Sequence, residues 1–128
     1  MLLEEKKSIV VDFLLNNFNC DLIYIFGSYA KNRERSNSDL DIAFLSDIKL
    51  DQYEIFLRAQ KLAEEIKCEV DLVDLKKAST VFKVQIVQGK LIYCSDKKIK
   101  EQFELDTLRK YAKLNEERVK ILERVWED

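Results

Sequence analysis

Residues 22–45 read LIYIFGSYAKNRERSNSDLDIAFL, and this stretch decides how the chain folds. Residues 22–26 form a short, nearly all-apolar run, which is the pattern of a buried central strand. A Gly-Ser pair at positions 27 and 28 ends this run. After a polar segment, residues 39–45 read as a second strand. The polar segment and the residues that flank it are therefore where we look for function.

Outside this stretch the chain alternates helical and strand patterns, with no proline, repeat or low-complexity linker. We expect helices at residues 2–17, 51–67 and 79–88, strands at 69–75 and 91–94, and one long helix or a helix pair from about 97 to 126. Gly89 is a suitable residue for the position that follows a helix end. This order predicts an α/β (α+β) fold, with helices on a sheet in one domain over residues 1–128: a core at about 22–94 and a helical tail at about 97–127.

The composition excludes several mechanisms. The chain has no histidine, so it cannot form Ser-His or Cys-His nucleophile pairs or imidazole metal sites. Its cysteines are widely spaced, without a CxxC motif, and we expect free thiols in a reducing compartment: Cys20, Cys68 and Cys94. Any catalysis must therefore use carboxylates, hydroxyls, lysines or arginines.

Charge and hydropathy also limit the binding partners and the cellular locations that the chain is expected to have. The net charge of −2 argues against direct, nonspecific nucleic-acid binding, which relies on a basic surface. No stretch approaches the ~20 apolar residues of a membrane span. The N-terminal residues are acidic where a signal peptide is basic, so we expect a cytoplasmic protein.

Three aspartates are candidates for a metal site. Asp39 and Asp41 are two apart in a strand pattern, and such residues share one face of a strand. Asp71, in the strand pattern of residues 69–75, points to the same side if the two strands are neighbours. Like charges this close repel unless a cation lies between them, and Mg²⁺ accepts a few carboxylates together with water and phosphate oxygens. Asp74 is the competing third ligand, but it precedes a turn and reads as a turn or cap residue.

The Gly-Ser pair suits a phosphate. Gly27 lets the backbone approach a ligand closely or adopt a positive φ. A helix that begins at Ser28 would direct free backbone N–H groups at the same place. Arg33 and Arg35 follow in the polar segment, where they touch phosphates or a partner, or lie in a solvated loop.

The order Gly-Ser, ten residues, Asp-x-Asp, then an aspartate in a later strand resembles the minimal nucleotidyltransferase (MNT) family of the DNA polymerase β superfamily. The resemblance covers residues 22–94 and implies a nucleotidyltransferase fold, a mixed sheet of about four strands flanked by helices. It implies an enzyme that uses ATP and Mg²⁺, with two ions expected. The residues it assigns to metal binding and catalysis are Asp39, Asp41 and Asp71, and those it assigns to the nucleotide are Gly27, Ser28, Lys31 and Ser38.

One departure from the family pattern concerns the nucleotide. Lys31-Asn32 stand where the family commonly has Arg-Gly. Lys31 keeps the positive charge but lacks the planar fork with which arginine binds phosphate through two hydrogen bonds. Asn32 adopts a left-handed turn conformation less easily than glycine.

Residues 70–75 (VDLVDL), followed by residues 78–81 (ASTV), resemble the small stand-alone members of this family that are the antitoxins of HEPN–MNT (type VII) toxin–antitoxin pairs. This resemblance implies transfer of AMP from ATP to a tyrosine hydroxyl of the cognate HEPN ribonuclease toxin, with release of pyrophosphate. It leaves open a homodimer or a hetero-oligomer with the toxin. Two alternatives remain: an antitoxin that acts by binding alone, and transfer to a small-molecule acceptor.

Two further features have alternative interpretations. Apolar residues of the tail form a stripe that either packs on the chain's own domain or docks a helical partner: Ile99, Phe103, Leu108, Tyr111, Ala112, Val119, Leu122 and Trp126. Tyr24 and Phe44 lie in strand patterns and are expected in the core. No residue that would read the nucleotide base stands out.

Overall fold

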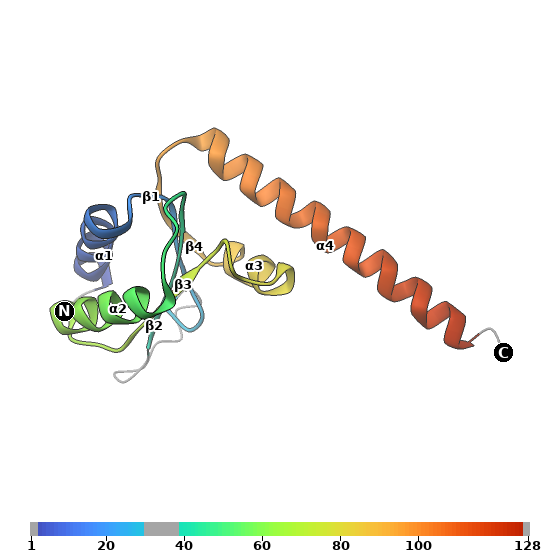
Figure 1. Cartoon of the computed structure of the whole chain (residues 1–128), viewed down its shortest axis with the longest axis horizontal. Coiled ribbons are helices and arrows are strands. Elements are labelled where there is room, and N and C mark those ends of the chain that lie inside the picture. The colour runs from blue at the N-terminus through green and yellow to red at the C-terminus, as the bar shows by residue number, and fades with distance from the viewer. Residues whose placement is uncertain (1–2, 30–38, 127–128) are drawn as a thin grey trace.

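The computed structural model describes residues 3–29 and 39–126 and shows a four-stranded mixed sheet with helices on both faces (Figure 1). The elements are α1 (Leu3–Phe18), β1 (Cys20–Phe26), β2 (Leu40–Ser46), α2 (Gln52–Ile66), β3 (Val70–Asp74), α3 (Thr80–Val87), β4 (Lys90–Cys94) and α4 (Lys97–Trp126). The strand order is β3-β2-β1-β4, in which β2 and β3 are parallel and the other pairs are antiparallel. The predicted α/β fold with about four strands is confirmed.

Each helix and strand expected outside the Gly-Ser turn is present, and no end differs from the prediction by more than two residues. Helix α2 begins after Asp51, whose side chain accepts a hydrogen bond from the backbone N–H of Tyr53 at 3.3 Å. It ends at Ile66, and the next residue, Lys67, adopts the left-handed conformation. Helical spacing predicts an apolar stripe on α2, and this prediction is partly wrong because Tyr53, Phe56 and Leu57 are exposed. The stripe predicted from the sequence consists of Tyr53, Phe56, Leu57, Leu62, Ala63 and Ile66. The residues buried from α2 are Ile55, Ala59, Leu62 and Ile66.

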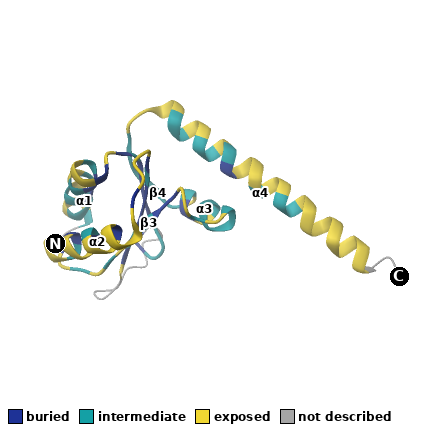
Figure 2. Cartoon of the chain, in the orientation of Figure 1, coloured by how far each residue is buried: buried dark blue, intermediate teal, exposed yellow. Residues whose placement is uncertain are grey.

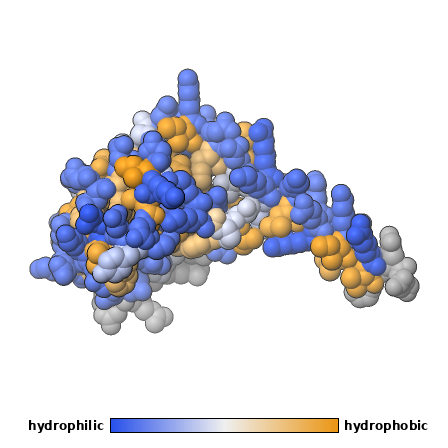
Figure 3. All heavy atoms as spheres, in the orientation of Figure 1, coloured by the Kyte–Doolittle hydropathy of each residue, from blue (hydrophilic) through white to orange (hydrophobic). Residues whose placement is uncertain are grey.

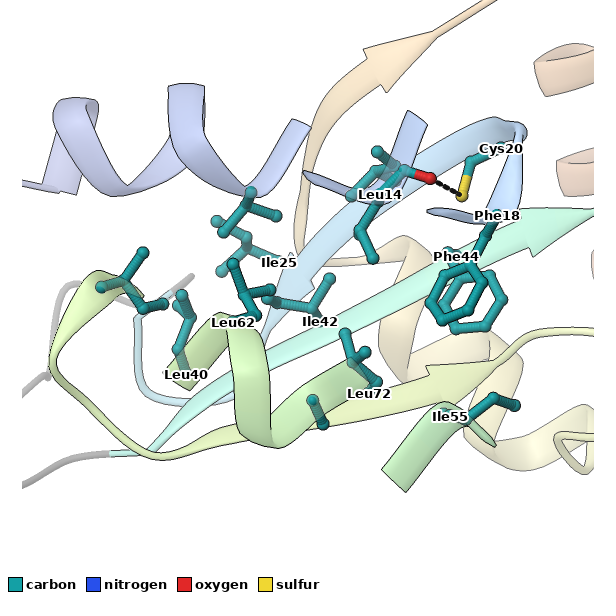
Figure 4. Packing of buried hydrophobic residues seen from close by; sticks show 14 of the residues in the cluster. Leu14, Phe18, Cys20, Ile25, Leu40, Ile42, Phe44, Ile55, Leu62 and Leu72 are labelled. Carbon is teal, nitrogen blue, oxygen red and sulfur yellow. Dashed lines mark hydrogen bonds between the residues drawn. The ribbon is translucent and has the colours of Figure 1, made fainter. Parts of the chain in front are cut away.

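The first face of the sheet is covered by α1 and α2 (Figure 1). Side chains from both helices interlock there with alternate residues of the strands, as Figure 4 shows. The Phe18 and Phe44 rings stack with centroids 4.9 Å apart and an interplanar angle of 17°. The Cys20 thiol is buried in the same cluster and donates to the carbonyl of Leu14 at 3.7 Å. This face is closed by apolar packing.

The second face is covered by α3 and by the first half of α4. Tyr24, buried as expected, packs here with Ala43 and Ile86, and Phe103 of α4 lies against this cluster. The Tyr24 hydroxyl donates to a carboxylate oxygen of Glu104 at 2.9 Å. The other oxygen of that carboxylate lies 3.3 Å from the ammonium of Lys100. The start of α4 is thereby fixed to the sheet through a hydrogen bond as well as apolar contact.

Helix α4 is one continuous helix of 30 residues, about 45 Å long at the usual rise per residue. Its first half meets the domain, whereas its second half projects away from it (Figures 1 and 2). From residue 116 onward every side chain that the structure describes is exposed, including Ile121 at 60% and Val125 at 67%. Hydrophobic residues recur among hydrophilic ones along this projecting part (Figure 3). Of the stripe predicted in the tail, Ile99 and Phe103 pack against the second cluster, whereas Leu108, Val119 and Leu122 are exposed.

None of the helices that the structure describes, α4 included, is long and apolar enough to cross a membrane.

Gly89 follows the end of α3, as expected, but not because it adopts a left-handed conformation. The helix does stop before Gly89, but among the described glycines only Gly27 has a positive φ. A Cβ atom at position 89 would overlap the backbone carbonyl oxygen of Ile25. Glycine is thus required because the connection between α3 and β4 runs against the backbone of β1.

Candidate active site

Strand β2 separates its side chains between the two faces of the sheet. Leu40 and Ile42 are fully buried in the cluster beneath α1 and α2. Because successive side chains of a strand alternate, Asp41 points to the second face, the one that α3 partly covers. Packing of its neighbours therefore holds the backbone of Asp41 in place.

Asp71 lies beside Asp41. The two residues are register partners in the parallel pairing of β2 with β3, so their side chains leave the sheet on the same face. On its other side, Asp41 is the register partner of Phe26 at the end of β1. Burial, followed by the charges of Asp71 and Asp39, raises the pKa of the Asp41 carboxyl. The three carboxylates are thus close enough to repel one another.

Asp39 is placed less firmly than the sequence suggests. Strand β2 begins at Leu40 rather than at residue 39, so Asp39 immediately precedes the strand, and it is exposed. Within residues 3–29 and 39–126, no three histidine, cysteine, aspartate or glutamate side chains form a group that could hold a metal ion. The described site is therefore a pair of carboxylates, Asp41 and Asp71, with a third negative charge nearby.

Such a pair fits Mg²⁺. Carboxylate oxygens are the ligands this ion prefers, and it often takes only one or two from a protein, completing its coordination with water and substrate phosphates. The raised pKa of Asp41 reflects partial burial and mutual repulsion, which a bound cation relieves. The donor chemistry of the pair thus suits the ion that the sequence predicts.

Gly27 forms the other side of the site. Its φ of 72° lies in the region that favours glycine, and a Cβ atom there would overlap the Oδ2 atom of Asp41. Gly27, Ser28 and Tyr29 form a turn, so the helix expected to begin at Ser28 is not present in these residues. Tyr29 is buried in the first core and accepts a hydrogen bond from the Lys6 ammonium at 3.4 Å. The turn is fixed by β1 on one side and by the Tyr29 ring on the other.

The remaining residues assigned to the nucleotide, Lys31 and Ser38, lie outside the described residues, as do Arg33 and Arg35.

Asp74 serves as a turn residue, as its position in the sequence suggested. It ends β3, is buried, and accepts a hydrogen bond from the backbone N–H of Lys76 at 3.0 Å through Oδ1. Its backbone carbonyl accepts from the N–H of Lys77, also at 3.0 Å. Among the described residues its Oδ2 atom has no hydrogen-bond partner. Asp74 points away from the face that carries Asp41, because it lies three positions beyond Asp71.

A pocket of about 550 Å³ opens beside Gly27 and Asp41, and sequence reasoning missed half of its wall. Phe26 of β1 forms one side, and its ring meets the edge of Phe82 of α3 with centroids 5.5 Å apart. The rest of the wall comes from the end of α3: Gln85, Gln88 and Gly89. Phe82 and Gln85 are three residues apart in α3 and therefore lie on one side of that helix, which was a readable signal. Only the fold shows that this side meets β1.

The chain matches a known protein family over most of its length. The family described as "Polymerase beta, Nucleotidyltransferase" matches residues 9–98. Protein adenylyltransferase MntA of Shewanella oneidensis is 40% identical over 125 residues, which are 96% of this chain and 88% of that protein. A chain from the crystal structure of a toxin–antitoxin with AMP-PNP superposes with a TM-score of 0.84 at 37% identity, covering 93% of this chain and 97% of that one.

A second solved structure contains a tri-AMPylated Shewanella oneidensis HEPN toxin in complex with an MNT antitoxin. One of its chains superposes with a TM-score of 0.81 at 34% identity, over 97% of this chain and 98% of its own length. The family match over residues 9–98 includes the Gly27 turn, β2 and β3, so it spans the whole candidate site.

Proposed function

Because this chain belongs to the polymerase β nucleotidyltransferase family, we propose that it transfers AMP from ATP to a tyrosine hydroxyl of a HEPN-type toxin. The similarity to a protein adenylyltransferase supports a protein acceptor. The similar chains solved with AMP-PNP and with a tri-AMPylated HEPN toxin support ATP and this class of partner. On this proposal the chain is the antitoxin of its pair.

The observation that carries the proposal is the pairing of Asp41 with Asp71 beside the Gly27 turn. The acceptor oxygen attacks the α-phosphorus of ATP, a new O–P bond forms, and the bond to the bridging oxygen breaks, so that pyrophosphate leaves. Asp71, on the outer strand of the pair, would take the proton of the acceptor hydroxyl. The turn at Gly27 and Ser28, with Lys31 and Ser38, holds the triphosphate.

We assign two Mg²⁺ ions to Asp39, Asp41 and Asp71. Bound there, the ions neutralise phosphate charge and lower the pKa of the acceptor hydroxyl. Asp41 and Asp71, which are adjacent on one face, and Asp39, the residue before β2, would hold the ions. Free cysteines among the described residues suit the cytoplasm, the compartment in which we place the reaction.

The test is label transfer from ATP labelled at the α-phosphate to the cognate HEPN protein. Asp41→Asn and Asp71→Asn should each lower transfer by roughly 10³-fold, because each removes a ligand that stabilises the transition state. Asp47→Asn, which changes an exposed aspartate just after β2, is the matched control and should transfer normally. Transfer that persists in the Asp41→Asn/Asp71→Asn double variant would reject the mechanism.

The projecting half of α4 favours a second function, neutralisation by binding alone. Its exposed apolar side chains provide a contact surface that the chain's own domain does not use, and the relatives' solved structures are of complexes. Co-expression in cells separates the two functions. If the Asp41→Asn variant relieves toxicity as well as the wild type does, occlusion suffices, and if it fails, the transfer is required.

A further inference from the structure

We propose that Gln85 and Gln88 of α3 read the base of the donor nucleotide in the pocket beside Asp41, and that they select adenine. This inference rests on the proposed function, since it deepens the substrate choice at the same site. It concerns two residues to which neither the motifs nor the family resemblance assigns a role.

The pocket is continuous with the catalytic face of the sheet. Gly27 and Asp41 form part of its wall, so a molecule that occupies the pocket lies directly against the residues that hold phosphate and metal. Its volume of about 550 Å³ is within the usual range of small-ligand sites. The pocket therefore has room for a base and its sugar next to the reacting phosphate.

The strand order indicates which substrate enters this pocket. In the order β3-β2-β1-β4, Asp71 lies on the β3 side of Asp41, whereas the pocket lies on the β1 side with Gly27. The residue assigned to the acceptor and the turn assigned to the triphosphate are thus on opposite sides of Asp41. The pocket belongs to the donor nucleotide.

The pocket wall has the chemistry that a base requires. Phe26 and Phe82 provide aromatic surface against which a base can pack. Gln85 and Gln88 are exposed, and among the described residues their side-chain amides have no hydrogen-bond partner. A carboxamide carries both a donor and an acceptor. Its oxygen can accept from the N6 amino group of adenine while its NH₂ group donates to the neighbouring ring nitrogen N7. Guanine presents two acceptors at the corresponding edge, so it satisfies only the donor half of the amide.

The experiment measures nucleotide preference and not activity alone. In the Gln85→Leu/Gln88→Leu variant, the ratio of kcat/KM for ATP to that for GTP should fall about tenfold or more, while label transfer continues with both nucleotides. Gln60→Leu, at an exposed position of α2 on the other face of the sheet, is the control and should keep the wild-type ratio. An unchanged ratio in the double variant would overturn the proposal.

A binding measurement separates this inference from the proposed function. Thermal shifts of the wild type and the double variant are recorded with ATP and with GTP, without acceptor. A larger shift with ATP that the double variant loses supports base reading even if no transfer to a HEPN protein is found. Equal shifts with both nucleotides in the wild type would reject base reading even if transfer is robust.

Discussion

The two faces of the sheet differ in how completely they are covered. Beneath α1 and α2 the covering is closed, and the buried side chains there are apolar except for Ser46 and Asp74. Beneath α3 and the start of α4 it is incomplete, and an open pocket lies beside two carboxylates. The larger buried cluster lies on the first face, which we therefore expect to contribute most to stability, whereas the second face carries the residues of the proposed reaction. Strand β2 serves both, because Ile42 and Asp41 are adjacent in sequence and opposite in direction.

This division requires a fixed register. A slip of β2 by one residue would turn Asp41 into the closed core and Ile42 toward the pocket. The apolar residues on both sides of Asp41 prevent that slip, since Leu40 and Ile42 are fully buried. The packing of the first face thus determines where the carboxylates of the second face lie.

The largest expected effect is on stability, from a change in the closed face. Phe44→Ala should lower the free energy of unfolding by about 3–5 kcal/mol, because it removes a fully buried ring that stacks on Phe18. Phe82→Ala should cost only about 1 kcal/mol, since that ring is half-buried beside the pocket. Urea denaturation of both variants gives the comparison. Equal losses would mean that the two faces contribute alike to stability.

The next effect is on activity, from a change in the open face. Gly27→Ala places a methyl group where the Oδ2 atom of Asp41 lies, at a positive φ that alanine disfavours. We expect label transfer to fall by roughly 100-fold, because a displaced carboxylate is a misplaced ligand. If the variant acts through Asp41, then in an Asp41→Ala background it should cause no further loss. Additive losses would show that Gly27 acts on the reaction by another route.

The smallest effect is a loss of stability at alkaline pH that involves both faces. Burial, then the charges of Asp21 and Asp74, raises the pKa of the Cys20 thiol from 9.0 to about 12 in the first core. In the buried cluster of the second face, burial and then the hydrogen bond to Glu104 raise the pKa of the Tyr24 hydroxyl above its ordinary value of 10.0. Each group binds its proton more tightly in the folded state than in the unfolded state. Its contribution to the free energy of unfolding is therefore complete below its pKa in the unfolded state, and it is lost as the pH rises through its pKa in the folded state.

We therefore expect the free energy of unfolding to fall between pH 8 and pH 11, and to fall more steeply above pH 10 than below it. Denaturation curves at a series of pH values measure the fall. Cys20→Ala should remove the part that begins near pH 9, and Tyr24→Phe the part that begins near pH 10. A pH profile that neither substitution flattens would contradict the assignment.

Local pattern was sufficient for the elements and for part of the site. The apolar runs and the two-residue period of β2 placed Asp41 opposite the core, and the capping aspartate of α2 marks where that helix begins. The buried stripe of α2 was harder to predict, because apolar residues occur on several sides of that helix. Only its docking against α1 and β3 leaves Tyr53 and Phe56 exposed.

Tertiary placement explains what the sequence did not reveal about the site. Gln85 and Gln88 acquire a role only because α3 ends above the Gly27 turn, and no local pattern encodes that position. Asp39 shows a second limit of sequence-based prediction. The Asp-x-Asp pattern predicts that Asp39 and Asp41 share one face of a strand, but Asp39 lies just before β2 begins. The roles of Asp39, Asp41 and Asp71 stay predictions that the label-transfer experiment decides.

The close approach of Gly89 to β1 lowers the cost of binding the nucleotide. Because the backbone at Gly89 lies against the carbonyl of Ile25, and Lys90 pairs with Ile25, the end of α3 is held to the sheet at the base of the pocket. That wall cannot swing outward without breaking strand pairing. Binding therefore requires little ordering of the protein on this side, and the entropy cost falls mainly on the nucleotide itself.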